Sequence, residues 1–235
     1  MTRIPLIAGN WKMNGASDWG GKVSELAGLT KGLEGVELLI CPPHPYLAML
    51  AGEPRVHIGG QDCHAEPSGA HTGEVSAEML RDVGASYVIV GHSERRAAGE
   101  TDAVVKAKAE AAHRAGLVPI VCVGEQLEER ERGSAVDVVL GQVDGSWPAT
   151  TGEVVVAYEP VWAIGTGKVA TPADIAAMHG ALRERLGQGV RILYGGSVKP
   201  ANAADVLGTA NVDGALVGGA SLDMESFAAI AHAAP

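Results

Sequence analysis

Short apolar runs recur along the chain at fairly even intervals. Several are continuously apolar rather than alternating, such as VVVAY at residues 154–158, and this pattern is typical of strands that are covered on both faces. Runs with the length of a strand occupy residues 5–11, 36–41, 56–60, 87–91, 118–124, 154–158, 191–194 and 214–218. We therefore expect eight buried strands.

The segments between these runs are rich in Ala, Leu, Glu and Arg at helical spacing, as at residues 102–115 and 174–186. Thr171 and Pro172 precede the second segment, an N-cap candidate followed by the residue favoured at the first helical position. Strand and helix alternate throughout the 235 residues, a length near the roughly 250 residues typical of a (β/α)8 barrel. We predict an α/β fold with a single (β/α)8 barrel domain at residues 1–235; an open doubly wound sheet is the alternative.

The composition is that of a globular chain with an acidic surface. Hydrophobic residues make up 46% and charged residues 20% of the sequence, and the net charge is -10. This charge disfavours contact with nucleic acid or an anionic membrane, so we expect neither partner. Any phosphate site must then rely on local donors. The charge run at residues 128–132 is expected to be the solvated face of a helix.

Cysteine usage and the lack of long apolar stretches predict a cytoplasmic protein. Cys41, Cys63 and Cys122 are odd in number and widely spaced, so reduced thiols are expected. The first apolar stretch is too short for a signal peptide, and no segment approaches the ~20 apolar residues of a membrane span.

Histidines and a cysteine cluster around the third run, at His57, Cys63, His64 and His71. Their spacing matches no zinc pattern, because Cys63 and His64 are adjacent and no second close pair follows. We predict no metal site.

Polar residues collect where the apolar runs end. In a parallel barrel all these ends open on one face, so residues distant in sequence converge there, and we expect that face to carry the active site. The residues concerned are Asn10, Lys12, His44, Gln61, Asp62, His92, Ser93, Glu94, Glu125, Glu159, Ser197, Gly218 and Gly219.

Glu159 ends the sixth run, and Pro160 holds it in an extended conformation at the strand terminus. An apolar lid over this carboxylate would desolvate it, raise its pKa and make it a stronger base. The predicted lid comprises Pro160, Val161, Trp162, Ala163, Ile164, Gly165, Thr166, Gly167 and Lys168. A structural ion pair between Glu159 and a buried arginine or lysine is the alternative on spacing alone.

His92, Lys12 and Asn10 are the other candidates for chemistry. A histidine at a strand end is often structural, but His92 shares its rim with Glu159. Asn10 and Lys12 are two residues apart, so both side chains can point into the mouth of the barrel. Taken alone, Lys12 could also be a surface lysine that extends from the rim.

Two Gly-Gly turns follow the last two runs, YGGS at residues 194–197 and VGGAS at residues 217–221. Bare amides at such turns can approach an anion closely, and phosphate sites in barrels recur at this position. Each pair could also serve a tight turn alone; both together favour a phosphate site.

The motifs AGNWKMN, VGHSERR, AYEPVWAIGTGK, YGGSV and LVGGASL occur in this order between residues 7 and 227. Together they resemble the triosephosphate isomerase family. The resemblance implies an isomerase that interconverts dihydroxyacetone phosphate and D-glyceraldehyde 3-phosphate through an enediolate, in glycolysis and gluconeogenesis, with no cofactor. The partners it implies are small triose phosphates.

The resemblance also implies a role for each matching residue. Glu159 would move the proton between carbons, and neutral His92 would polarise the carbonyl. Lys12 would supply positive charge and Asn10 would orient the substrate, with Ser93 and Glu94 as supporting residues. Amides at four positions would bind the phosphate: Gly165, Ser197, Gly218 and Gly219.

A homodimer is a further implication of the resemblance. The family's third loop, matched by GAHTGE at residues 69–74, inserts into the neighbouring subunit, so Thr72 would contact the partner subunit. His71, Asp62 and Ala98 depart from the residues common in the family, and these departures bear on the packing between subunits.

Two other functions are weighed against isomerisation. A Schiff-base aldolase would use Lys12 as its nucleophile, but it gives Glu159 and the lid no role. A sugar-phosphate-binding protein without activity should lack part of the catalytic set, yet Asn10, Lys12, His92 and Glu159 are all present.

Overall fold

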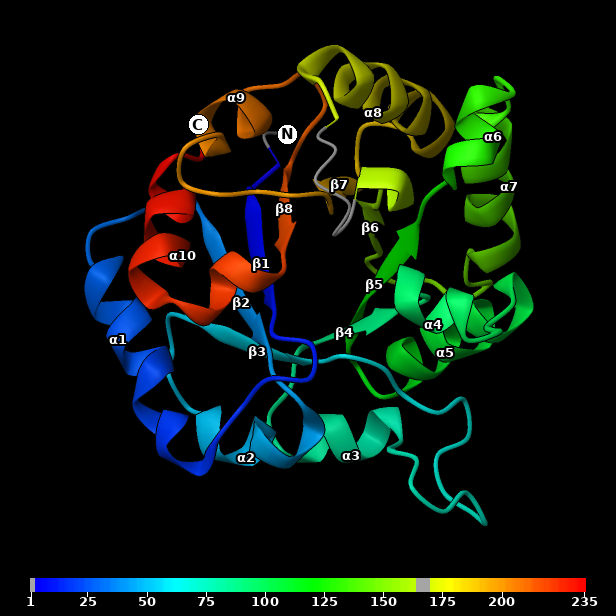
Figure 1. The fold of residues 1–235 in the computed structure, drawn as a ribbon. Coiled ribbons are helices and arrows are strands. Elements are labelled where there is room, and N and C mark those ends of the chain that lie inside the picture. Colours follow the sequence, from blue (N-terminus) through cyan, green and yellow to red (C-terminus); the bar gives the residue numbers. More distant parts are fainter. Residues whose placement is uncertain (1–2, 164–169) are drawn as a thin grey trace.

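The computed structural model describes residues 3–163 and 170–235. Within these ranges eight parallel strands close into a barrel in chain order, and helices surround it (Figure 1). The strands are β1 (Leu6–Asn10), β2 (Glu37–Cys41), β3 (His57–Gly60), β4 (Tyr87–Val90), β5 (Val118–Val123), β6 (Val155–Tyr158), β7 (Arg191–Tyr194) and β8 (Gly214–Val217).

Closure of the barrel is set by β1, which pairs with both neighbours. Leu6 is in register with Glu37 of β2 on one side and with Gly214 of β8 on the other. The predicted (β/α)8 fold is therefore confirmed, and the open sheet is wrong. Each predicted strand end lies within one residue of the observed end.

The helices of the described ranges alternate with the strands and cover the outside of the barrel (Figure 1). They are η1 (Ser17–Gly21), α1 (Lys22–Leu29), η2 (His44–Tyr46), α2 (Leu47–Leu50), α3 (Ala77–Asp82), α4 (Ser93–Ala97), α5 (Asp102–Arg114), α6 (Leu127–Glu131), α7 (Ala135–Ser146), η3 (Val161–Ala163), α8 (Pro172–Leu186), α9 (Ala203–Leu207), η4 (Gly219–Leu222) and α10 (Met224–His232). None of these helices is long and apolar enough to cross a membrane.

Helix α8 begins where the sequence predicts. The Thr171 hydroxyl accepts a hydrogen bond from the Asp174 amide at 3.2 Å, and the Asp174 carboxylate accepts one from the Thr171 amide at 3.0 Å. This capping box satisfies two amides that no helical carbonyl can reach.

Alternate residues of most strands enter two separate apolar layers. Leu6 and Ala8 belong to the core inside the barrel, whereas Ile7 between them packs against the helices. Both layers exclude water, which explains the continuous apolar runs. Cys41, Cys63 and Cys122 are buried free thiols, and burial raises the pKa of the Cys63 thiol to about 12.

Candidate active site

One cavity of about 370 Å³ lies at the carboxyl ends of the strands. It collects residues that follow β1, β4, β6, β7 and β8, as expected for the rim of a parallel barrel. Its lining consists of Asn10, Lys12, His92, Glu159, Gly195, Gly196, Ser197, Val198, Lys199, Leu216, Gly218, Gly219 and Ala220. The structure therefore brings together most of the predicted rim.

Glu159 is 2% exposed and is held from α4. Its Oε2 accepts a hydrogen bond from the Ser93 amide at 2.9 Å, and its Oε1 accepts one from the Ser93 hydroxyl at 3.1 Å. His92 Nε2 lies 3.0 Å from the same Oε1. The partners of Glu159 are thus other candidate site residues, and the alternative of an ion pair with a buried lysine or arginine is not observed among the described residues.

The predicted direction of the Glu159 pKa shift is wrong for this arrangement. Burial raises the pKa of Glu159, but the hydrogen bonds from His92 and from the Ser93 amide and hydroxyl together outweigh burial, so the pKa lies below its ordinary value. Hydrogen bonds to a carboxylate favour its charged form. The sequence pattern indicated that Glu159 is buried, but it did not reveal the hydrogen-bond donors of Ser93 and His92.

The His92 ring is oriented by the first turn of α4. Its Nδ1 accepts a hydrogen bond from the Glu94 amide at 3.2 Å. A ring nitrogen that accepts from an amide carries no proton, so the proton of the neutral ring is assigned to Nε2, facing Glu159. His92 is therefore arranged to present an N–H donor at the mouth.

Asn10 and Lys12 reach the mouth together, as predicted. Asn10 Oδ1 accepts a hydrogen bond from the Lys12 amide at 3.0 Å, and Gln61 Nε2 donates to the Lys12 carbonyl at 2.8 Å. Lys12 has φ of 52°, a left-handed conformation that is costly for a side chain of this kind. These two bonds hold that conformation. The Lys12 ammonium forms an ion pair with Glu94.

The glycines of the two predicted anion turns serve different purposes. A Cβ on Gly195 would lie 2.8 Å from Glu159 Cγ, and one on Gly196 would lie 2.2 Å from the Tyr194 hydroxyl oxygen, so both glycines make room for neighbouring side chains. A Cβ on Gly219 meets no described atom within 4 Å, and on Gly218 only Lys12 Cε at 3.7 Å. The space above Gly218 and Gly219 is open for a ligand.

The predicted lid is described only in part. Pro160 to Ala163 follow β6, whereas Ile164, Gly165, Thr166, Gly167 and Lys168 lie outside the described residues. Trp162 Nε1 donates to Glu125 Oε1 at 2.8 Å, and the Arg130 guanidinium lies 4.6 Å from the centre of the Trp162 ring. Glu125 is fully buried.

The charge run at residues 128–132 is largely the predicted solvated face, since Glu128, Glu131 and Arg132 are exposed, and Arg130 is the exception. Arg130 is half-buried and also forms ion pairs with Glu125 and Asp174, which joins α6 to the start of α8. The alternating charges of the run gave no sign of this, because all three partners lie outside it.

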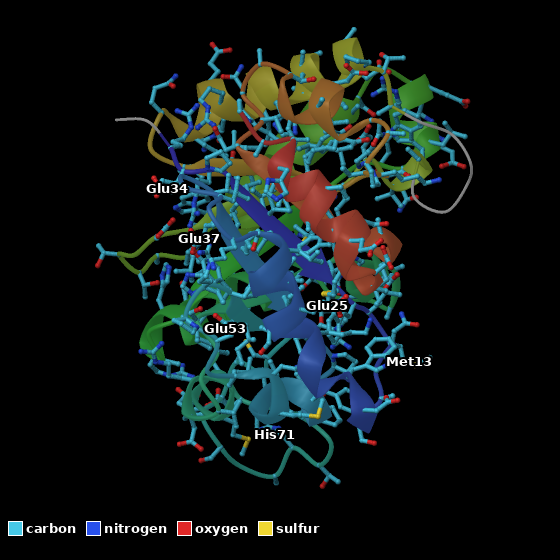
Figure 2. The ribbon with its side chains drawn as sticks, turned by 90° about the vertical axis from the view of Figure 1, so that its left-hand side faces the viewer. Met13, Glu25, Glu34, Glu37, Glu53 and His71 are labelled. Atoms are coloured by element: carbon cyan, nitrogen blue, oxygen red, sulfur yellow. The ribbon has the colours of Figure 1, made fainter. Side chains whose placement is uncertain are left out.

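The loop between β3 and α3 projects from the barrel (Figure 1). Thr72 is exposed near its tip, and Figure 2 shows the neighbouring His71 on the projecting segment at the lower end of the molecule. The His71 ring stacks on His64 with ring centroids 3.9 Å apart. In residues 3–163 and 170–235 no group of three or more His, Cys, Asp and Glu side chains is placed to hold a metal ion.

Asp62 has partners within the chain. Its carboxylate accepts two hydrogen bonds from Lys108 Nζ, both at 2.8 Å, and pairs with Arg95 at 2.7 Å. Asp62 thus belongs to an ion-pair cluster beside α4. Sequence reasoning missed Lys108 and also Lys199; the latter could have been found, because it lies two residues beyond Ser197 on the rim.

The fold and the cavity together define a class of protein. It is a (β/α)8 enzyme with a carboxylate and an imidazole at one end of a small pocket and open glycine amides at the other. Comparison with known proteins gives the family: the sequence model of triosephosphate isomerase matches residues 5–234. The chain belongs to the triosephosphate isomerase family.

Individual relatives agree with this assignment. The chain is 59% identical to the triosephosphate isomerase of Afipia carboxidovorans and 57% identical to that of Xanthobacter flavus, and each alignment covers 98% of both proteins. Among solved structures, the crystal structure of triosephosphate isomerase from Bartonella henselae superposes with a TM-score of 0.90 at 44% identity, covering 98% of each chain.

Proposed function

We propose that this chain interconverts dihydroxyacetone phosphate and D-glyceraldehyde 3-phosphate through an enediolate, without a cofactor. One observation carries the proposal: the Glu159 carboxylate lies 3.0 Å from His92 Nε2 in the same cavity as Gly218 and Gly219. The reaction needs a base near a C–H bond, an N–H donor near an oxygen and a grip on the phosphate. Membership of the family supports the same activity and a place in glycolysis and gluconeogenesis.

Glu159 is the proposed base that moves a proton between the two carbons. In the resting arrangement it accepts two hydrogen bonds from Ser93, and these stabilise the carboxylate and weaken it as a base. When the Glu159 side chain rotates towards the substrate, it loses both hydrogen bonds from Ser93 but stays buried. The pKa of Glu159 then rises, and the base strengthens where the C–H bond lies.

His92, Lys12 and Asn10 are the proposed partners of the substrate oxygens. The Nε2 proton of neutral His92 can be donated to a carbonyl oxygen as negative charge develops there. The Lys12 ammonium adds positive charge on the same side, and the Asn10 side chain, fixed by the Lys12 amide, orients the substrate. Ser93 and Glu94 support this set by holding Glu159, His92 and Lys12.

The phosphate is proposed to bind to the amides of Ser197, Gly218 and Gly219, with Gly165 contributing from the lid. Backbone donors suit an anion in a chain of net charge -10 because they need no cationic surface. Closure of residues 160–168 over the pocket would exclude water and protect the enediolate. No nucleic acid, membrane or metal partner is part of this proposal.

The ion pair between Lys12 and Glu94 disfavours the aldolase alternative. The Lys12 nitrogen that would attack a carbonyl is engaged by the Glu94 carboxylate, and a Schiff-base scheme gives Glu159 no role. Borohydride added with either triose phosphate should leave the chain unmodified, and a covalent adduct on Lys12 would establish the aldolase instead.

A coupled assay on D-glyceraldehyde 3-phosphate tests the activity directly. We expect turnover by the wild-type chain and its loss in Glu159→Gln, which keeps the shape of the side chain and removes the base. In D₂O the product should carry deuterium at the carbon that receives the proton. An inactive wild-type chain, or equal activity of the two chains, would refute the proposal.

We also propose that the chain forms a homodimer in which Thr72 contacts the partner subunit near its mouth. The tip of the projecting loop is exposed from Glu66 to Glu74, and Met13, next to Lys12, is 96% exposed at the edge of the molecule (Figure 2). A partner subunit seated at this edge of the molecule would cover the Met13 side chain. Sedimentation equilibrium should give twice the chain mass, and Thr72→Arg should weaken the association.

We infer further that residues 1–235 act as one domain and that the protein works in the cytoplasm. The first strand pairs with the last, so neither half of the chain has a complete sheet of its own. Limited proteolysis should therefore yield no stable half-barrel fragment.

A further inference from the structure

Lys199 is a second lysine at the mouth of the barrel. It follows β7 and lines the same cavity as Lys12, His92 and Glu159. Its side chain forms no hydrogen bond or ion pair with any residue that the structure describes, whereas the Lys12 ammonium is paired with Glu94. Of these two cations, Lys199 is the one whose charge no described residue balances.

The backbone of Lys199 is fixed on the rim by Asn202. Asn202 Oδ1 accepts a hydrogen bond from the Lys199 amide at 2.7 Å, and its Nδ2 donates to the Ser197 carbonyl at 3.1 Å. Pro200 restricts the preceding residue to an extended conformation. The turn that places Ser197 in the lining of the pocket therefore also carries the exposed Lys199.

The charges around the cavity make this cation significant. Among the described residues that line it, the charged side chains are Lys12, Lys199 and Glu159, and Lys12 is already paired with Glu94. Without Lys199 the described lining would have only the paired Lys12 to offset the negative charge of Glu159, in a chain of net charge -10. A phosphate dianion approaching such a mouth would be repelled.

We propose that Lys199 attracts the phosphate dianion of the substrate into the mouth and raises the rate of productive encounter. It acts before and during binding, through its field, while the backbone amides hold the bound phosphate. This inference rests on the proposed function for the identity of the substrate. Its signature is a dependence on ionic strength, because salt screens an exposed charge.

The test compares kcat/KM across ionic strength for four chains: the wild type, Lys199→Gln, Lys199→Arg and Lys106→Gln. Lys106 is the matched control, since it is a lysine of α5 outside the cavity and has no hydrogen bond or ion pair with a described residue. For Lys199→Gln we expect kcat/KM to fall by about three- to tenfold at ~0.01 M salt and by less than about twofold at ~0.5 M salt. Lys199→Arg should retain most of the wild-type value, and kcat should fall less than kcat/KM.

Binding of glycerol 3-phosphate, which has the same dianion but no carbonyl, separates this inference from the proposed function. Loss of affinity in Lys199→Gln at low salt, with Lys106→Gln close to wild type, supports the role of Lys199 even if the chain has no isomerase activity. Equal affinities and equal salt dependences in these two variants overturn it even if the chain is an active isomerase.

Discussion

His92 and Glu159 lie in contact across the mouth of the barrel, with Nε2 3.0 Å from Oε1. The other polar atom of each group is held by the same first turn of α4. His92 Nδ1 accepts from the Glu94 amide, and Glu159 Oε2 accepts from the Ser93 amide. One short segment of chain therefore sets the geometry of both proposed proton-transfer groups.

Glu159→Asp should cost turnover far more than affinity. The change withdraws the carboxylate by one methylene, and a displacement near 1 Å of a reacting group costs about 10²-fold or more in rate. The phosphate contacts proposed at Gly218 and Gly219 are unaffected, so KM should change by less than about threefold. Steady-state kinetics in both directions provide the measurement, and undiminished turnover would remove Glu159 from the mechanism.

Ser93→Ala should move the acid limb of the pH profile of kcat/KM to higher pH. The pKa of Glu159 lies below its ordinary value because the bonds from His92 and Ser93 outweigh burial. Removal of the Ser93 hydroxyl deletes one of these bonds, so the pKa of Glu159 in the free enzyme rises, and kcat/KM reports the free enzyme. A profile identical to that of the wild type would show that the hydroxyl does not tune the base.

The same variant should alter how stability depends on pH. A carboxylate with a depressed folded-state pKa contributes stability above its unfolded pKa and loses it as the pH falls through the folded pKa. Ser93→Ala should therefore cost about 1.5–3 kcal/mol at pH 7, for a hydrogen bond to a charged group. The difference should shrink below the unfolded pKa of a glutamate. Urea unfolding at several pH values measures it.

The sequence predicted the strands well because strands buried on both faces leave continuous apolar runs, which a single chain records locally. The predicted direction of the Glu159 pKa shift was wrong because the groups that lower this pKa are distant in the sequence. Ser93 and His92 are more than 60 residues away from Glu159 in the chain. Two partners of Arg130, Asp174 and Trp162, are likewise distant in the chain, as are the partners of Asp62. Spacing places residues on the rim, but it does not show which atoms meet there.

Gly219→Val should weaken phosphate binding without unfolding the chain. A Cβ on Gly219 meets no described atom within 4 Å, so the free protein has room for it, while the added methyl groups occupy the proposed phosphate space. We expect the affinity for glycerol 3-phosphate to fall by about tenfold or more, which corresponds to a loss of at least ~1.4 kcal/mol in binding free energy. Calorimetric titration measures this, and an unchanged Kd with an unchanged Tm would place the phosphate elsewhere.

Lys108→Met should destabilise the chain by about 3 kcal/mol, because it leaves buried carboxylates with too few partners. Lys108 is 5% exposed and Asp62 is 8% exposed, and Lys108 Nζ also pairs with Glu100. Adding Asp62→Asn should recover part of the lost stability, because it removes one of the buried carboxylates that have lost their partner. Lys106→Met on the same helix is the control and should stay within about 0.5 kcal/mol of wild type. Unfolding at fixed protein concentration compares the variants, and equal losses at the two lysines would contradict the role of the cluster.

Gly124→Ala should disrupt the joint between β5 and β6 that places Glu159. A Cβ on Gly124 would lie 1.8 Å from the Glu159 carbonyl oxygen, a backbone atom that cannot move aside without shifting the strand. Gln142 clamps this point by accepting from the Gly124 amide at 2.8 Å and donating to the Gly124 carbonyl at 3.0 Å. We expect a loss of about 3 kcal/mol in stability together with a fall in kcat, since the base moves with the strand.

Gly141→Ala is the matched control. Gly141 lies in α7, and a Cβ at this position meets no described atom within 4 Å. Alanine in place of glycine at a helix interior should stabilise the chain by about 0.5–1 kcal/mol. Opposite signs of the stability change in the two variants, with activity lost only in the first, are the expected result; a stable and fully active Gly124→Ala chain would mean that Glu159 is not positioned through this contact.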